Sequence, residues 1–267
     1  MYKITMTFKL KKPADSDAVH DVWRVLSEYS ASGQLLGDYL VTRDSSGKSI
    51  RVTGVAHERS AFSQRYGSRD LGKALTRLKR RLRAPVRRDW ERFAEDPKTC
   101  DCAKPSRLLF SPHLQLEASP FRCLDCRGRR PEYRLRNRVR TDSCRNLARQ
   151  CHGFYWIWMD SGETEALAWR QLADPESEMS RMVKKQLRDL EKRIGIPVYY
   201  DLPAHYVSKL EDSPETRPCP GCGRPWTVES DPALTCVRCR LFSYTPVDGR
   251  PPGWWRPLPR HRRATRP

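Results

Sequence analysis

Alternating and helically spaced apolar positions divide the first part of the chain into strands and helices. Residues 2–10 (YKITMTFKL) alternate apolar and polar side chains, which predicts a strand. Residues 15–29 carry apolar side chains every three or four positions, and Asp15 to Asp17 are suitable caps for a helix that begins there. The apolar positions of this predicted helix are Val19, Val22, Leu26 and Tyr29.

A hairpin and a strongly basic helix follow. Residues 38–56 contain two β-rich runs around the turn-forming stretch 44–47 (DSSG), which predicts a hairpin. Residues 70–86 place leucines on one face and basic side chains on the rest of a helix, and we expect Pro85 to end it. The order β-α-β-β-α therefore predicts a small α+β sandwich domain over residues 1–98.

The rest of the chain mixes short strands with helices and ends in a ribbon and a tail. Gly195 suits the C-cap of a helix over residues 176–194. The other elements that we expect are strands at 107–110, 114–117, 133–135 and 196–203, and helices at 142–158 and 163–173. The predicted fold class is α+β. Its parts are the domain at 1–98, a cysteine-containing strand and helix domain at 99–210, a zinc ribbon at 211–247 and a basic Pro/Arg-rich tail at 248–267.

Four cysteines near the C-terminus have the spacing of a structural zinc site. They form two CxxC pairs, in CPGC and CVRC, and each pair can make a tight turn whose two sulfurs face one centre. Four thiolate ligands leave no open coordination position, so the ion would stabilise a segment that has little core of its own. The alternative, a redox-active CxxC, lacks its usual βαβ context and leaves the second pair unexplained. The predicted ligands of Zn²⁺ are Cys219, Cys222, Cys236 and Cys239.

A second set of cysteines predicts a weaker site. Cys100 and Cys102 lie in TCDC, and Cys123 and Cys126 lie in RCLDC, so that the four could form another four-sulfur site, with His113 as a substitute ligand. The spacing of Cys144 and Cys151 is ordinary for a helix core. For these two cysteines and for His152 we therefore expect burial rather than metal binding.

Charge and hydropathy limit the class of protein. The net charge is +19, which favours polyanionic partners, although a solvated arginine-rich surface would have the same composition. No run approaches the roughly 18 apolar residues of a membrane span, and the N-terminus does not resemble a signal peptide. We expect a cytoplasmic protein, where ten cysteines are better explained as metal ligands or free thiols than as disulfides.

Arginine and tryptophan residues near the cysteines favour nucleic-acid binding. Arginine contacts phosphates and aromatic rings stack on unpaired bases, and no base-reading motif is present, so we expect little sequence specificity. The predicted contact residues are Arg80, Arg81, Arg224, Arg238, Arg240, Trp254 and Trp255. The alternative is a protein-interaction module that binds an acidic partner, such as a regulator or an immunity or inhibitor protein for a bacterial toxin.

Motifs of catalysis are absent. The sequence contains no GxxxxGK[ST], no GxGxxG after a strand and no HExxH. Cys151 precedes His152 directly, but adjacency in sequence does not align a nucleophile with a base. We therefore expect a protein without enzymatic activity.

Three stretches together resemble a known family. They are SPFRCLDCRGRRPEYRL (119–135), GIPVYYDL (195–202) and the closing CPGCGRPW…CVRCR, and SGETEALAWRQL (161–172) supports them. In these motifs the chain resembles a bacterial family of uncharacterised proteins described as containing a zinc ribbon, for which nucleic-acid binding is inferred from that ribbon. The resemblance implies that the four C-terminal cysteines are ligands and that Cys123 and Cys126 matter. It implies no reaction.

Overall fold

The computed structural model describes residues 1–92, 99–112, 119–135, 142–160, 164–202, 218–228 and 233–244. The chain folds into two units. The first comprises Met1–Ser106, Gln115–Arg145 and Arg193–Gly195, and the second comprises Arg107–Leu114, Asn146–Lys192 and Ile196–Pro267. Among the described residues, no helix combines the length and the apolar character that a bilayer crossing requires.

A four-stranded antiparallel sheet lies in the first unit, and residues Tyr2–Lys9 form a strand of it, as their alternating pattern predicts. Its strands are β1 (Tyr2–Lys9), β2 (Leu36–Arg43), β3 (Ser49–Ala56) and β4 (Arg87–Arg92), in the order β2-β3-β1-β4. β4 was not predicted, because in RRDWER only Trp90 is apolar. It pairs along β1 from Tyr2↔Arg92 to Thr7↔Arg87. With two helices the order becomes β-α-β-β-α-β, which is the ferredoxin-like arrangement.

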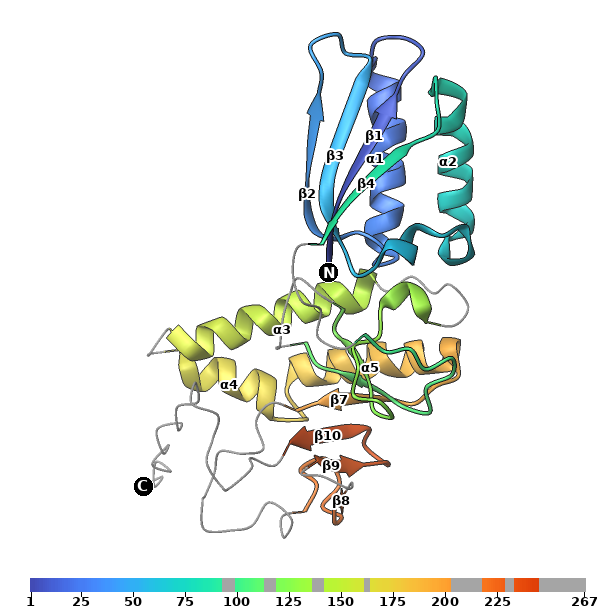
Figure 1. Ribbon diagram of the computed structural model, residues 1–267. Coiled ribbons are helices and arrows are strands. Elements are labelled where there is room, and N and C mark those ends of the chain that lie inside the picture. The colour runs from blue at the N-terminus through green and yellow to red at the C-terminus, as the bar shows by residue number, and fades with distance from the viewer. Residues whose placement is uncertain are drawn as a thin grey trace. The chain divides into compact units, whose positions relative to one another are not determined.

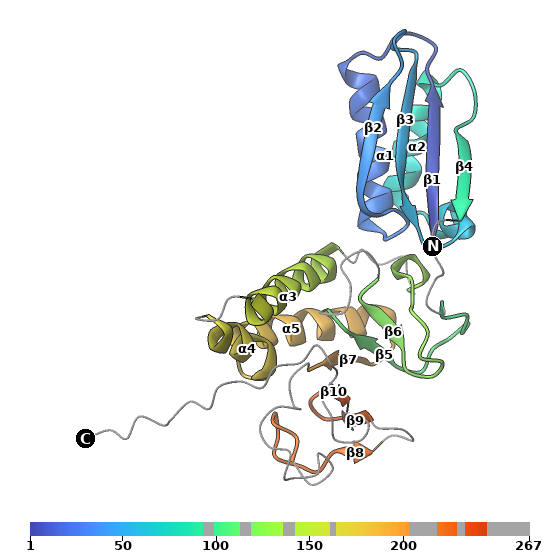
Figure 2. The same cartoon turned by 60° about the vertical axis from the view of Figure 1, so that its left-hand side comes forward.

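Two helices cover one face of this sheet (Figures 1 and 2). In α1 (Ser16–Ala31) the Asp15 carboxylate caps the helix by accepting from the Ala18 N–H at 2.7 Å. The second helix, α2 (Arg69–Arg81), ends before Pro85, because Leu82 already bridges to Leu10 as extended chain. Both helices bury apolar side chains against the inner face of β1, which carries Ile4, Met6 and Phe8.

The second unit contains a sheet that joins segments far apart in sequence. The strands of this sheet that belong to the second unit follow the order β5-β7-β10-β9-β8. They are β5 (Leu108–Phe110), β7 (Val198–Asp201), β8 (Thr227–Val228), β9 (Ala233–Cys236) and β10 (Leu241–Tyr244). β7 runs parallel to both β5 and β10. In Figure 1, α5 (Glu178–Ile194) lies along β7, and α4 (Glu165–Ala173) lies beside α3 (Asp142–Asp160).

Several sequence-based expectations need correction or fall outside the described residues. Residues Glu132–Arg134 form a 3-10 turn that begins after Pro131, not a strand. The predicted strand 114–117 and the tail 248–267 lie in segments that the structure does not describe. The two units also differ from the four-part division, because β10 pairs directly with β7 through Leu241↔Tyr200 and Phe242↔Asp201.

Candidate metal centres and a cationic cavity

The side chains of the four C-terminal cysteines converge. We call the set Cys219, Cys222, Cys236 and Cys239 the C-terminal cluster. Their sulfurs all lie within 4.8 Å of one another, and the Sγ atoms of Cys222 and Cys236 are 3.7 Å apart. A tetrahedral ion with metal–sulfur bonds of about 2.3 Å needs sulfur–sulfur edges of about 3.8 Å. A disulfide needs about 2.05 Å. The cluster therefore has the dimensions of a four-thiolate metal site.

Local backbone geometry aims these sulfurs. The Gly221 N–H points to the Cys219 Sγ at 3.4 Å, and the Cys239 N–H points to the Cys236 Sγ at the same distance. The residue after each CxxC pair, Gly223 or Arg240, adopts a left-handed conformation, with φ of 66° and 55°. This turn reverses the chain directly behind the second sulfur, as a metal-binding knuckle requires.

The other four cysteines also meet, and we call them the central cluster: Cys100, Cys102, Cys123 and Cys126. Their sulfurs lie within 4.8 Å of one another, with 3.9 Å between the Sγ atoms of Cys102 and Cys123. Arg127 follows Cys126 with a φ of 58°, so the CLDC turn has the same form as the two C-terminal knuckles. Cys100 and Cys102 supply the other two sulfurs of the central cluster. Residues two positions apart in an extended chain place their side chains on the same side, which lets a CxC pair face one centre. His113, the substitute ligand, lies outside the described residues.

Two arginines, Arg130 and Arg134, lie beside the central cluster. The Arg130 guanidinium is buried and lies 3.7 Å from the Cys100 Sγ, and it also donates to the Cys102 carbonyl at 2.6 Å. Arg134 donates to the Cys100 carbonyl at 2.9 Å and pairs with Glu58. These donors orient the ligands and offset the negative charge of thiolates.

The remaining two cysteines lie on α3. Cys144 and Cys151 are buried, which agrees with the core positions expected for them, and burial raises the pKa of the Cys151 thiol to about 12. His152 is half-buried, and its Nε2 accepts from the Trp156 indole N–H at 2.6 Å. Within the described residues, neither cysteine lies in a metal-binding cluster.

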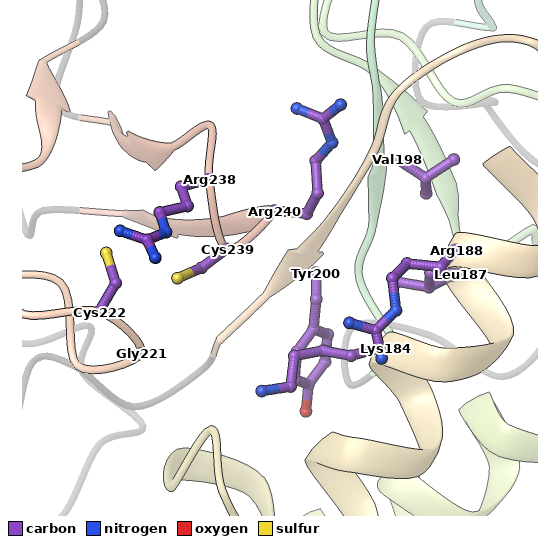
Figure 3. A pocket seen from close by; sticks show the side chains of 10 residues that line it. All are labelled: Lys184, Leu187, Arg188, Val198, Tyr200, Gly221, Cys222, Arg238, Cys239 and Arg240. Carbon is purple, nitrogen blue, oxygen red and sulfur yellow. The ribbon is translucent and has the colours of Figure 1, made fainter.

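A cavity of about 340 Å³ adjoins the C-terminal cluster (Figure 3). Lys184 and Arg188 project from α5 on one side, and Arg238, Cys222 and Cys239 lie on the opposite side. Among the residues that the structure describes, no acidic side chain lines it. The lining residues are Lys184, Leu187, Arg188, Val198, Tyr200, Gly221, Cys222, Arg238, Cys239 and Arg240.

The cations of this cavity differ in their partners. Lys184 pairs with Glu176 at 3.2 Å, and Arg240 pairs with Glu191 at 2.9 Å. Arg188 and Arg238 make no side-chain hydrogen bond or ion pair within the part of the chain that the structure describes. Both side chains are exposed.

The predicted contact residues separate into engaged and exposed groups. Arg81 is engaged by Asp15, Asp17 and Asp21, with 2.8 Å between its Nε and the buried Asp21 carboxylate. Arg240 is engaged by Glu191, so both arginines form ion pairs between elements and are only partly exposed. The exposed members are Arg80, Arg224 and Arg238, and the predicted Trp254 and Trp255 lie outside the described residues.

Lys184 and Arg188 were missed as candidate contact residues. Their helix was predicted, but its polar face shows no sign that it will lie opposite the cysteine knuckles. The spacing of four residues between them places both on one helix face, which is the only signal in the sequence.

Comparisons with known proteins name no activity for this chain. No family model matches it. An uncharacterized protein of Haemophilus influenzae is 25% identical over 243 residues, which are 85% of this chain and 88% of that protein. A second uncharacterized protein of the same organism is 32% identical over 91 residues, and the chain spans 44% of its length.

Solved structures similar to this chain cover about a third of it. One is the crystal structure of an antibiotic biosynthesis monooxygenase, with 10% identity and a TM-score of 0.30, which covers 36% of this chain and 100% of that one. The resemblance to a zinc-ribbon family therefore stays a prediction.

Proposed function

We propose that this chain is a non-enzymatic zinc protein whose C-terminal segment is a zinc ribbon that binds nucleic acid with little sequence specificity. The observation that carries the proposal is the cavity of Figure 3, where two arginines with no ion-pair partner among the described residues adjoin a four-cysteine cluster. Each feature alone is common. Together they place cations on a segment that a metal ion would keep rigid.

Zinc suits both clusters by ligand chemistry. Sets of four thiolates in tetrahedral arrangement favour Zn²⁺ or an iron–sulfur centre over the hard ions that prefer oxygen. With four protein ligands the ion has no open position for a substrate or water, so its role is to stabilise the fold. The proposed ligands are those of the C-terminal cluster, with the central cluster as a second site.

A metal ion bound by four cysteines would leave the centre negatively charged. A divalent ion with four thiolates carries a formal charge of about −2, which nearby cations partly balance. Arg238 lies beside this centre, and with Arg188 on α5 and the exposed Arg224 it supplies the cations proposed to bind phosphates. The absence of acidic side chains from the cavity lining keeps this surface favourable for a polyanion.

Salt dependence tests nucleic-acid binding. We expect fluorescence anisotropy with a labelled single-stranded oligonucleotide to show an affinity that falls steeply with salt and hardly varies with sequence. Arg188→Gln should reduce the slope of log affinity against log salt by about one. Arg181→Gln is the matched control, since Arg181 is exposed two turns away on α5 and does not line the cavity. An affinity insensitive to salt, or equal losses in both variants, would contradict the proposal.

Metal content tests the ion. We expect about two zinc ions per chain by elemental analysis of protein purified without added metal. The double variant Cys222→Ser with Cys236→Ser should lose one ion, and Cys102→Ser with Cys126→Ser should lose the other. If the parent protein holds only one ion, the second site is wrong. If it holds iron instead of zinc, the clusters are iron–sulfur centres and the zinc ribbon is wrong.

A protein-interaction role is the second candidate, because large apolar side chains are exposed on α3 and α4. Trp156 is 54% exposed, Ile157 is 42% exposed and Leu167 is 60% exposed. Exposed aromatic and aliphatic side chains are typical anchors of protein interfaces. Purification from native lysate with and without nuclease separates the two candidates, since a partner that remains after nuclease treatment favours this one.

A further inference from the structure

The first unit contains a larger cavity, of about 910 Å³, that the proposed function does not use. It is lined by α2 and by the segment that leads from α2 into β4. Six large apolar side chains line it, and Leu75 is the half-buried member among the leucines. The apolar side chains of the lining are Phe62, Leu71, Leu75, Leu78, Leu82 and Val86.

Every charged side chain that lines this cavity is a cation. They are Arg69, Lys79, Arg83 and Arg88. The first three form no side-chain hydrogen bond or ion pair with residues that the structure describes. Arg88 lies 5.6 Å from the centre of the Phe62 ring and 3.5 Å from the Tyr29 hydroxyl, so its guanidinium is held at the cavity by neutral partners only.

We propose that this cavity binds an amphipathic organic anion, with an apolar body and one carboxylate, sulfonate or phosphate group. A volume of 300–1,000 Å³, apolar walls and a few convergent charged groups are typical of small-molecule sites. The half-buried Leu75 and Val86 would contact the apolar body, and the guanidinium groups, which have no acidic partner among the described residues, would bind the acidic group.

Two other ligands fit the cavity less well. A nucleic-acid strand needs exposed rings for stacking, but the aromatic residues of the lining, Tyr29 and Phe62, are both buried. A metal ion needs acidic, histidine or cysteine ligands, and none lines the cavity. The inference is independent of the proposed function, because it uses residues of the first unit only.

Displacement of a fluorescent anion tests the site in the full chain. We expect the apolar sulfonate 1-anilinonaphthalene-8-sulfonate to bind and to be displaced by dodecanoate, but not by dodecanol or dodecylamine at the same concentration. Arg83→Gln and Arg88→Gln should each weaken dodecanoate binding by about tenfold, as the loss of one charge-assisted hydrogen bond implies. Leu75→Glu should abolish it, because a carboxylate would enter the apolar wall.

Arg77→Gln is the matched control, since Arg77 is exposed on the same helix and does not line the cavity. It should bind dodecanoate like the parent protein, and thermal unfolding should show that all variants are folded. Equal weakening by Arg77→Gln would indicate a general charge effect and overturn the site. Displacement by dodecanol as strong as that by dodecanoate would overturn the preference for an anion. If neither the dye nor dodecanoate binds, the cavity is not a ligand site.

Discussion

The Arg240 guanidinium donates two hydrogen bonds to the Glu191 carboxylate, one of 2.9 Å from Nη2 to Oε1 and one of 3.2 Å from Nε to Oε2. Arg240 directly follows the last cysteine of the C-terminal cluster, and Glu191 belongs to α5. The same glutamate accepts from the Val198 N–H of β7 at 3.2 Å. One carboxylate therefore joins a cysteine knuckle, a helix and a strand within the second unit.

Breaking this pair should destabilise the second unit. Because both side chains are partly buried, we expect Arg240→Gln to lower the free energy of unfolding by about 1–2 kcal/mol. Denaturant unfolding of Arg240→Gln, Glu191→Gln and the double variant measures the coupling energy. Arg224→Gln, which removes an exposed arginine that follows the first knuckle, should leave the stability nearly unchanged. A coupling energy near zero would show that the pair contributes nothing to the fold.

The glycines of the first knuckle should respond differently to alanine. Gly223 has a φ of 66° and open space at its Cβ position, so Gly223→Ala should cost about 1 kcal/mol of conformational strain. At Gly221 an added Cβ would lie 3.1 Å from the Cys239 Sγ, so Gly221→Ala should weaken metal binding by displacing a ligand. Competition with a chromophoric chelator measures the affinity, and denaturant unfolding measures the stability. Equal losses of metal affinity in the two variants would contradict this assignment.

Thiol reactivity should report metal loss in a defined order. In the metal-loaded protein we expect almost no alkylation at pH 7, because eight cysteines are ligands and Cys144 and Cys151 are buried. After chelation Cys222 should react first, since the Arg224 backbone N–H lowers the pKa of its thiol to about 7. Cys151 should react last, since burial raises the pKa of its thiol. Peptide mass spectrometry over time measures the order, and early labelling of Cys151 would contradict it.

Acid should remove the contribution of Glu58 to stability. Burial alone would raise the pKa of Glu58, but the hydrogen bonds and charge of Arg134, with hydrogen bonds from Ser60 and Tyr133, lower it overall. A carboxyl whose pKa is lower in the folded state contributes stability above its unfolded pKa of about 4.3 and loses it as the pH falls through the folded value. We therefore expect the stability difference between parent and Glu58→Gln to be full at pH 7 and to shrink below about pH 4.

Urea unfolding at several pH values checks the Glu58 prediction. Glu91→Gln is the control, because the Glu91 side chain is 70% exposed in its pair with Lys3. Its effect should be small at every pH. A difference for Glu58→Gln that stays constant from pH 7 to pH 3 would show that its ionisation is not linked to folding.

Elements encoded in contiguous residues were predictable. The Asp15 cap, the helix over 178–194 and the strand over residues 2–10 follow from local spacing and from side chains within one turn. β4 could not be predicted, because RRDWER lacks an alternating pattern and becomes a strand only by pairing with β1. The central cluster could be named as a set of cysteines. Its assembly depends on the bridge between Thr99 and Arg129, which no spacing reveals.

The roles of the arginines also depended on distant residues. Arg81 and Arg240 belong to segments that suggest solvated basic surfaces, yet their partners Asp21 and Glu191 lie 60 and 49 positions away. Arg188 shows the reverse, because an ordinary helix surface faces the cysteine knuckles across a cavity. Charge alone therefore did not distinguish the arginines that hold the fold from those that remain available.

The amino-acid sequence by itself determined the helices, the paired CxxC turns and the excess of positive charge, because each depends on residues that are neighbours along the chain. Only the tertiary structure decided that β10 extends the sheet of β7, that the central cysteines converge, and which arginines are neutralised. These features arise when folding brings together residues that are far apart in the sequence. Strand pairing and ion pairing then select partners by position in space, which local patterns do not specify.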